Sequence, residues 1–164
     1  APGRQHRALA NAPAPVLWLS FKNERIGRPV SDETPYEQVT DGIRVSVTPE
    51  YSDDQSTPDE GYFFWIYTVE ISNESERTVQ LKSRVWRITD ASGKTDEVRG
   101  PGVIGLTPQI PPGQSFTYSS GCPLSTPSGI MVGSYQMVDE SGRLFDVAIP
   151  AFSLDSPYAS RSVN

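Results

Sequence analysis

The chain has 164 residues, of which 36% are hydrophobic and 21% charged, and its formal net charge is −6. The hydrophobic share excludes wholesale disorder, whereas 13 Gly and 15 Pro are too many for a helix bundle, because these residues cost about 1 and 3 kcal/mol inside a helix. One His and one Cys exclude a Cys/His zinc site, an internal disulfide and most His-assisted catalysis. No hydrophobic run approaches the roughly 18 residues that would span a bilayer, so we expect one soluble domain without a membrane partner.

The first 40 residues are predicted to form an irregular, basic extension. Residues 1–30 carry a net charge of +4, whereas the rest of the chain carries −10 and is therefore not expected to bind nucleic acid. Prolines lack a backbone N–H and have a fixed φ, which excludes a long helix or a central strand here. They stand at Pro2, Pro13, Pro15, Pro29 and Pro35. The hydrophobic stretch Val16–Phe21 is too short for a secretory leader, so it either packs on the domain or binds a partner protein through Trp18.

From Asp41 onward, hydrophobic and polar residues alternate with the period of β-strands. The alternation is strongest in Tyr62–Asn73, and it changes phase within Val79–Thr89, which predicts a β-bulge. Seven strands are predicted, near residues 42–48, 62–73, 78–89, 95–99, 114–120, 130–138 and 143–149. Seven short strands without a helix predict an all-β antiparallel sandwich of fibronectin type III or immunoglobulin type over residues 41–155, followed by a tail at 156–164.

The segment Gly100–Gly105 matches the GxGxxG pattern of dinucleotide-binding proteins. In those proteins the glycines open a helix, but here three prolines follow within residues 108–112 and exclude one. Two interpretations are left. Gly100, Gly102 and Gly105 serve backbone geometry or close packing, or their N–H groups form a small anion site.

A basic strip in the predicted strand pair offers a second candidate anion site. It comprises Lys82, Arg84, Arg87 and Arg99. A carboxylate or phosphate could be held there if the side chains share one face. The alternative is that these residues pair with acidic neighbours such as Asp90, Asp96 and Glu97.

Few residues suit catalysis or metal binding. The acidic segment Glu50–Glu60 has no EF-hand spacing and is predicted to be a solvated loop. Ser119–Cys122 resembles a nucleophile cluster, but the only His is His6 in the extension, so turn chemistry is the favoured interpretation. Asp139 and Glu140 stand beside Ser141-Gly142, where a hairpin turn explains them. We therefore expect no catalytic residue, no metal site and no cofactor.

A family pattern runs through the predicted strands and turns. Its residues are Trp65-x-Tyr67-x-Val69-x-Ile71-x-Asn73, Ser83-Arg84-x-Trp86-x-Ile88, Gly100-x-Gly102-Val103-x-Gly105, Pro112-Gly113, Thr126-Pro127-x-Gly129-x-Met131-x-Gly133-x-Tyr135-x-Met137 and Ile149-Pro150-x-Phe152. Over residues 40–154 the chain resembles the ApaG family. The resemblance implies a fibronectin-type sandwich. It also implies a role in protein contacts, because similar domains mediate such contacts in eukaryotic F-box proteins and in a polymerase-delta-interacting protein. For bacterial members it implies a role connected with cobalt and magnesium efflux.

The family resemblance also implies that the glycine motif binds pyrophosphate. It further implies that the bacterial gene lies near a gene for a dinucleoside tetraphosphate hydrolase. Three departures weaken a hydrolytic or metal-dependent function here. Val85 and Ser134 stand where relatives often have His, and Leu106-Thr107 stands where Glu-Gln usually follows the glycines.

These observations predict a non-catalytic, cytoplasmic binding module that recognises an unidentified protein, with a homodimer as a further form. Tyr62 and Phe64 are the expected exposed anchors on the domain, since aromatic residues are frequent anchors at interfaces. The alternative is a nucleotide- or pyrophosphate-binding protein that uses Gly100–Gly105 with Arg84, Arg87 or Arg99. A third hypothesis is that the basic extension contacts an acidic partner or the domain itself.

Overall fold

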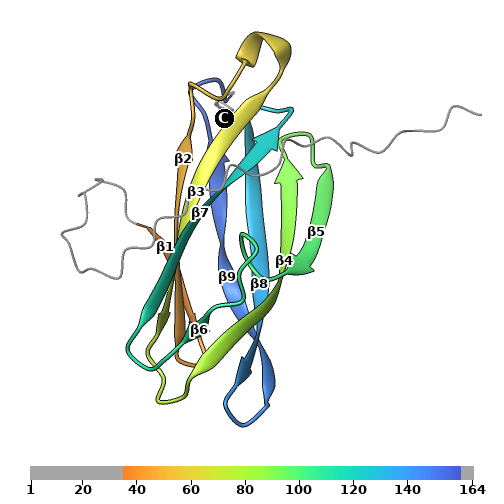
Figure 1. The fold of residues 1–164 in the computed structure, drawn as a ribbon. Coiled ribbons are helices and arrows are strands. Elements are labelled where there is room, and N and C mark those ends of the chain that lie inside the picture. Colours follow the sequence, from red (N-terminus) through yellow and green to blue (C-terminus); the bar gives the residue numbers. More distant parts are fainter. Residues whose placement is uncertain (1–34, 160–164) are drawn as a thin grey trace, which may run out of the picture.

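In the computed structural model, residues 35–159 are described, and they form two antiparallel β-sheets packed face to face (Figure 1). The first sheet has the order β1 (Tyr36–Thr40), β2 (Ile43–Tyr51), β3 (Phe63–Asn73) and β7 (Ser115–Leu124). The second has the order β5 (Thr95–Pro101), β4 (Val79–Asp90), β8 (Ser128–Asp139) and β9 (Leu144–Asp155), with the short β6 (Gln109–Ile110) beside β4. A 3-10 turn, Pro58–Glu60, lies between β2 and β3. The predicted all-β antiparallel sandwich is confirmed.

The two sheets are stacked so that β1 and β2 lie against β9. Because the strand orders run outward from that contact, β7 and β5 lie at the opposite side of the sandwich. This side carries the glycine motif and most of the predicted basic strip.

The alternation of side chains along each strand decides which residues form the core. The odd-numbered residues of β3 from Phe63 to Ile71 are buried, as the sequence pattern predicts. The rings of Tyr67, Trp86 and Phe152 meet between the sheets, with centroids 5.4 to 5.9 Å apart. Each large hydrophobic side chain buried in this way stabilises the fold by roughly 1.5–3 kcal/mol.

A bulge in β4 decides which of its side chains point inward. The pairing with β8 shifts register between Leu81 and Ser83, which confirms the predicted bulge. After the shift, the even-numbered residues face the core, so Trp86 is buried whereas Arg87 is exposed. Arg84 therefore lies on the same inner face as Trp86.

Two strands were not predicted. β1 lies inside the range assigned to the N-terminal extension, and its exposed sequence, YEQVT, shows no hydrophobic alternation because it is an edge strand on the surface. β6 has only two residues. The interpretation of Ser119–Cys122 as turn chemistry is wrong, because these residues continue β7 to Leu124. Their backbone pairs with residues 65–68 of β3, and the hydroxyl of Ser119 also bonds that of Thr68 at 2.8 Å.

Within residues 35–159, no helix is long and apolar enough to cross a membrane.

Candidate functional site

The glycine motif forms a tight turn whose amides bind back to the protein. The N–H of Gly102 donates to the carbonyl of Lys82 at 2.8 Å. Val103 and Leu106 exchange N–H to O bonds of 2.8 and 2.9 Å across the turn. Its two central residues, Ile104 and Gly105, have φ of 46° and 77°, the left-handed geometry of a type I′ turn. Three of the amides that an anion site would need are therefore already bonded.

Arg84 is brought to this turn, as predicted, but it meets carbonyl oxygens. Its Nη1 donates to the carbonyls of Pro101 at 3.0 Å and Gly102 at 2.8 Å. The guanidinium also lies against Gly100, where an added Cβ would stand 3.1 Å from Nη1. Arg84 thus anchors the glycine turn to β4.

Behind Arg84 lies a buried cluster of tyrosines. The hydroxyls of Tyr118 on β7 and Tyr135 on β8 are hydrogen-bonded to each other, so the cluster ties one sheet to the other. Burial raises the pKa of Tyr67 to about 12, and burial also raises the pKa values of Tyr118 and Tyr135, although the nearby charge of Arg84 acts in the opposite direction. The structural contribution of the cluster is the hydrogen bond between the sheets, which is formed by two neutral hydroxyls.

The rest of the basic strip lies elsewhere. Arg87 and Arg99 are on the outer face of the second sheet, where Arg87 Nη2 and Arg99 Nε lie 3.5 and 2.5 Å from the carboxylate of Glu97. The hydrogen bond from Arg99, followed by its charge, lowers the pKa of Glu97. Pairing with Glu97 is therefore the correct interpretation for these two residues. Lys82 is exposed at the bulge. The strip does not form a single site, because strand alternation and the bulge divide it between two faces.

Exposed hydrophobic side chains lie beside Arg87 on the outer face of the second sheet. Ile130 is 52% exposed and Val132 is 37% exposed, and in the strand register they lie opposite Thr89 and Arg87. We call Val85, Arg87, Ile130 and Val132 the outer patch. The predicted strand at 130–138 already contains this alternation, but which of its faces lies outside follows only from the packing of the sheets.

The three predicted aromatic anchors differ in how exposed they are. Phe64 is only 7% exposed, so the prediction that it is an exposed anchor is wrong. It is covered because Gly121 leaves room for its ring: an added Cβ at Gly121 would stand 2.2 Å from Phe64 Cζ. Tyr62 is partly exposed, and Trp18 lies outside the described residues.

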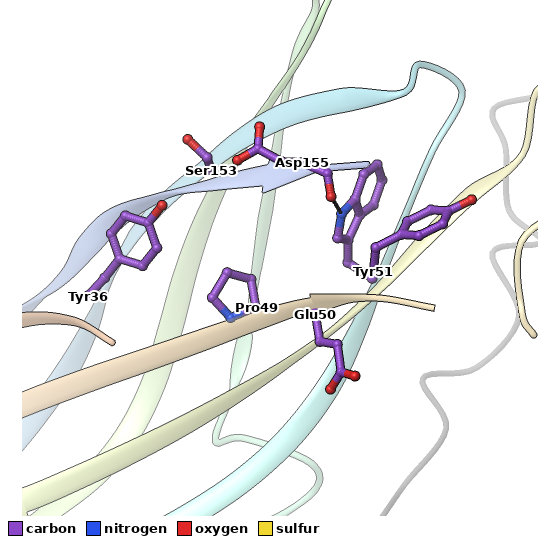
Figure 2. Close-up of a pocket in the computed structure, with 7 residues that line it drawn as sticks. Tyr36, Pro49, Glu50, Tyr51, Ser153 and Asp155 are labelled. Atoms are coloured by element: carbon purple, nitrogen blue, oxygen red, sulfur yellow. Dashed lines mark hydrogen bonds between the residues drawn. The ribbon is translucent and has the colours of Figure 1, made fainter. Parts of the chain in front are cut away.

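A pocket of about 410 Å³ opens between β2 and β9, beyond the start of β1. Figure 2 shows the ring of Pro49 pointing into this gap, Tyr36 to one side of it, and the carboxylate of Glu50 turned away across β2. The indole of Trp65 donates to the carbonyl of Asp155 at 2.8 Å and is only 1% exposed. The indole N–H is therefore not available to a ligand, whereas the buried hydroxyl of Tyr51 in the same lining has no hydrogen-bond partner among the described residues.

The Ser119–Cys122 segment is not an activated nucleophile. Cys122 is 2% exposed, and burial raises the pKa of its thiol to about 12, so it stays protonated at neutral pH. Among residues 35–159, no three His, Cys, Asp or Glu side chains gather in a way that would hold a metal ion.

Comparison with known proteins decides the family. The model of the ApaG domain matches residues 53–139. The chain is also 58% identical over 129 residues to Protein ApaG of Brucella anthropi and 54% identical to that of Beijerinckia indica, covering 79% of this chain and 99% of each relative. The chain belongs to the ApaG family. A solved structure described as the putative ApaA protein of Bordetella pertussis is 45% identical, with a TM-score of 0.69, covering 71% of this chain and 95% of the other.

The matched ApaG region includes both the glycine turn and β4 with Arg84. The ApaG relatives align over almost their whole length with 129 residues of this chain, so the sandwich is the part that these proteins share.

Proposed function

We propose that this ApaG sandwich is a non-catalytic module that binds another protein through the outer patch. The observation that carries the proposal is the exposure of Ile130 and Val132 in the middle of the second sheet, beside the ion pairs of Arg87 and Arg99 with Glu97. A hydrophobic centre with arginine at its rim is the composition that protein interfaces favour. The edge of the sheet would supply the polar rim.

Two properties of the site support a binding role over chemistry. The thiol of Cys122 is only 2% exposed, and the hydroxyls of Tyr118 and Tyr135 are buried and bond each other. The pyrophosphate alternative has less support, because the amides of Gly102, Val103 and Leu106 and one nitrogen of Arg84 are bonded within the turn.

The experiment compares proteins captured from cells by three forms of the full chain: wild type, Val132→Lys and Val39→Lys. Val39 is 49% exposed on β1, in the other sheet, so it is a matched control. We expect one protein to be retained by wild type and Val39→Lys, to be lost with Val132→Lys, and to bind the purified chain directly. Equal capture by all three forms would exclude the outer patch as the binding surface.

We further propose that this interaction operates in the cytoplasm, where a chain with a single Cys needs no disulfide, and that it underlies a role in cobalt and magnesium tolerance. The test is growth on elevated cobalt of a deletion strain complemented with the same three forms. Wild type and Val39→Lys should restore growth and Val132→Lys should not. Restoration by all three would separate metal tolerance from the outer patch.

A further inference from the structure

The four edges of the two sheets are protected to different degrees. Open edges attract other strands, and proteins usually protect them with charges, prolines or a covering segment. β1 is short and follows Pro35, β5 carries Asp96, Glu97 and Arg99, and β9 contains Pro150 and donates from Ala148 N–H to Thr40 on β1. In contrast, β7 has eight residues, 115–122, without a charge or a proline. Within the described chain, β7 pairs only with β3.

The ladder between β3 and β7 shows which groups of this edge are open. Asn73 N–H donates to the carbonyl of Gln114, which identifies that pair as hydrogen-bonded. Bonded and non-bonded pairs alternate in an antiparallel ladder, so the even-numbered residues of β7 bond to β3. Thr117, Ser119 and Gly121 therefore direct their N–H and C=O groups toward the open edge.

A second, independent observation lies on the neighbouring strand of the other sheet. Val98 of β5 pairs with Trp86, so its side chain is on the inner side of the second sheet. It is nevertheless 42% exposed, and β5 lies with β7 at the side of the sandwich away from the contact of β1 and β2 with β9. If β7 pairs with β7 of a second copy, the second sheets of both copies lie on the same side of the joint, so the partner's β5 would approach β5 and cover Val98.

We propose that a second copy of this chain occupies the edge, with β7 pairing antiparallel to β7 of the partner and extending the first sheet to eight strands. The strand is self-complementary. When Ser119 stands opposite its own symmetry mate, Thr117 stands opposite Gly121 on the outer face and Tyr118 stands opposite Ser120 on the inner face, so no charged side chains meet along β7 of the two acidic domains.

The size of the joint sets its strength. Pairing over residues 117–121 forms roughly six backbone hydrogen bonds, and a joint along one strand stays below the roughly 1,200 Å² of standard interfaces. The dimer is therefore weak and concentration-dependent. It uses the first sheet and leaves the outer patch of the second sheet open, so it is separate from the proposed partner binding.

The first test measures the mass of the full chain by sedimentation equilibrium between about 10 µM and 1 mM, the range in which small interfaces associate. Ser119→Pro removes an outward N–H but none of the bonds to β3, and Ser119→Ala removes the same hydroxyl contact with Thr68 but keeps the N–H. We expect wild type and Ser119→Ala to dimerise equally, and Ser119→Pro to dimerise at least about tenfold more weakly. A monomeric wild type at the highest concentration, or equal association of all three, would overturn the proposal.

A charge-pair experiment does not depend on the folding of the proline variant. Ser119→Asp and Ser119→Lys should each be monomeric alone, because like charges would meet across the joint, whereas an equal mixture should form heterodimers. Failure of the mixture to associate at 1 mM would contradict the joint, as would dimers of either variant alone.

Amide exchange distinguishes a second copy from another occupant. Exchange at Thr117, Ser119 and Gly121 should slow as concentration rises, together with a shift of the Val98 methyl resonances. Protection that does not change with concentration would mean that another segment of the same chain covers the edge, and would overturn the homodimer. Val132→Lys should leave every one of these measurements unchanged, so failure of the dimer and failure of the outer patch are distinguishable.

Discussion

Arg84 and Gly102 are joined by a hydrogen bond of 2.8 Å, from the guanidinium Nη1 to the carbonyl oxygen, and this contact holds the glycine turn against β4. The charge of Arg84 is therefore used to satisfy backbone carbonyls at the edge of the core. In this protein a motif that resembles an anion loop is arranged as a packing element.

Arg84→Ala should lower the free energy of unfolding by about 1–2 kcal/mol, because it removes two hydrogen bonds from a charged donor to backbone carbonyls. Amide exchange at Val103 and Leu106 should accelerate as the turn loosens. The matched control is Arg87→Ala on the same strand, whose exposed pair with Glu97 contributes at most about 1 kcal/mol. Urea unfolding and hydrogen exchange measure both variants; an equal effect of the two substitutions on the turn amides would contradict the anchoring role.

The three glycines of the motif should differ in how strongly an alanine substitution destabilises the fold, because each is required for a different structural reason. At Gly102 an added Cβ would stand 2.2 Å from the carbonyl oxygen of Leu106, and φ is 58°, so Gly102→Ala should be severely destabilising, by more than about 3 kcal/mol. Gly105→Ala meets open space but has φ of 77°, which costs about 1–2 kcal/mol. Gly100→Ala presses on Arg84 Nη1, the donor of both anchoring bonds, so it should cost no more than Arg84→Ala and less than Gly102→Ala. Thermal unfolding gives the order, and a larger loss at Gly100 than at Gly102 would contradict it.

The sequence pattern predicts the sandwich, the buried face of β3 and the bulge in β4, because period-2 alternation and its change of phase are local properties. Whether Phe64 is exposed depends on Gly121 of a neighbouring strand, 57 positions away in the chain, and no local pattern contains that contact. For the same reason, the local pattern does not predict the hydrogen-bond partners of Arg84. Its place on the inner face follows from the bulge, but its carbonyl partners follow from the path of the glycine turn.

Asp139 should make stability depend on pH in the acid range. The hydrogen bond from Ser141 and then that from Arg77 lower the pKa of this carboxyl well below its usual value, against the effect of burial. The unfolded chain, with a pKa near about 4, therefore binds more protons, so the stabilisation is complete above about pH 5 and is lost as pH falls. Asp139→Asn should flatten the dependence of the free energy of unfolding on pH between about 5 and 2. The control is Asp146→Asn, an exposed residue of β9, which should keep the wild-type slope; a steep slope in Asp139→Asn would contradict the assignment.

Two tyrosine hydroxyls should respond in opposite directions to the same chemical change. In the part of the chain that the structure describes, the hydroxyl of Tyr51 is buried without a hydrogen-bond partner, so Tyr51→Phe should raise the free energy of unfolding by up to about 1 kcal/mol. Tyr118 and Tyr135 bond each other, and Tyr118→Phe leaves the Tyr135 hydroxyl buried and unpaired, which should cost about 1–3 kcal/mol. Urea unfolding of both variants at one pH compares the same loss of an oxygen at two buried sites. Destabilisation by Tyr51→Phe as large as that by Tyr118→Phe would mean that Tyr51 has a partner in solution.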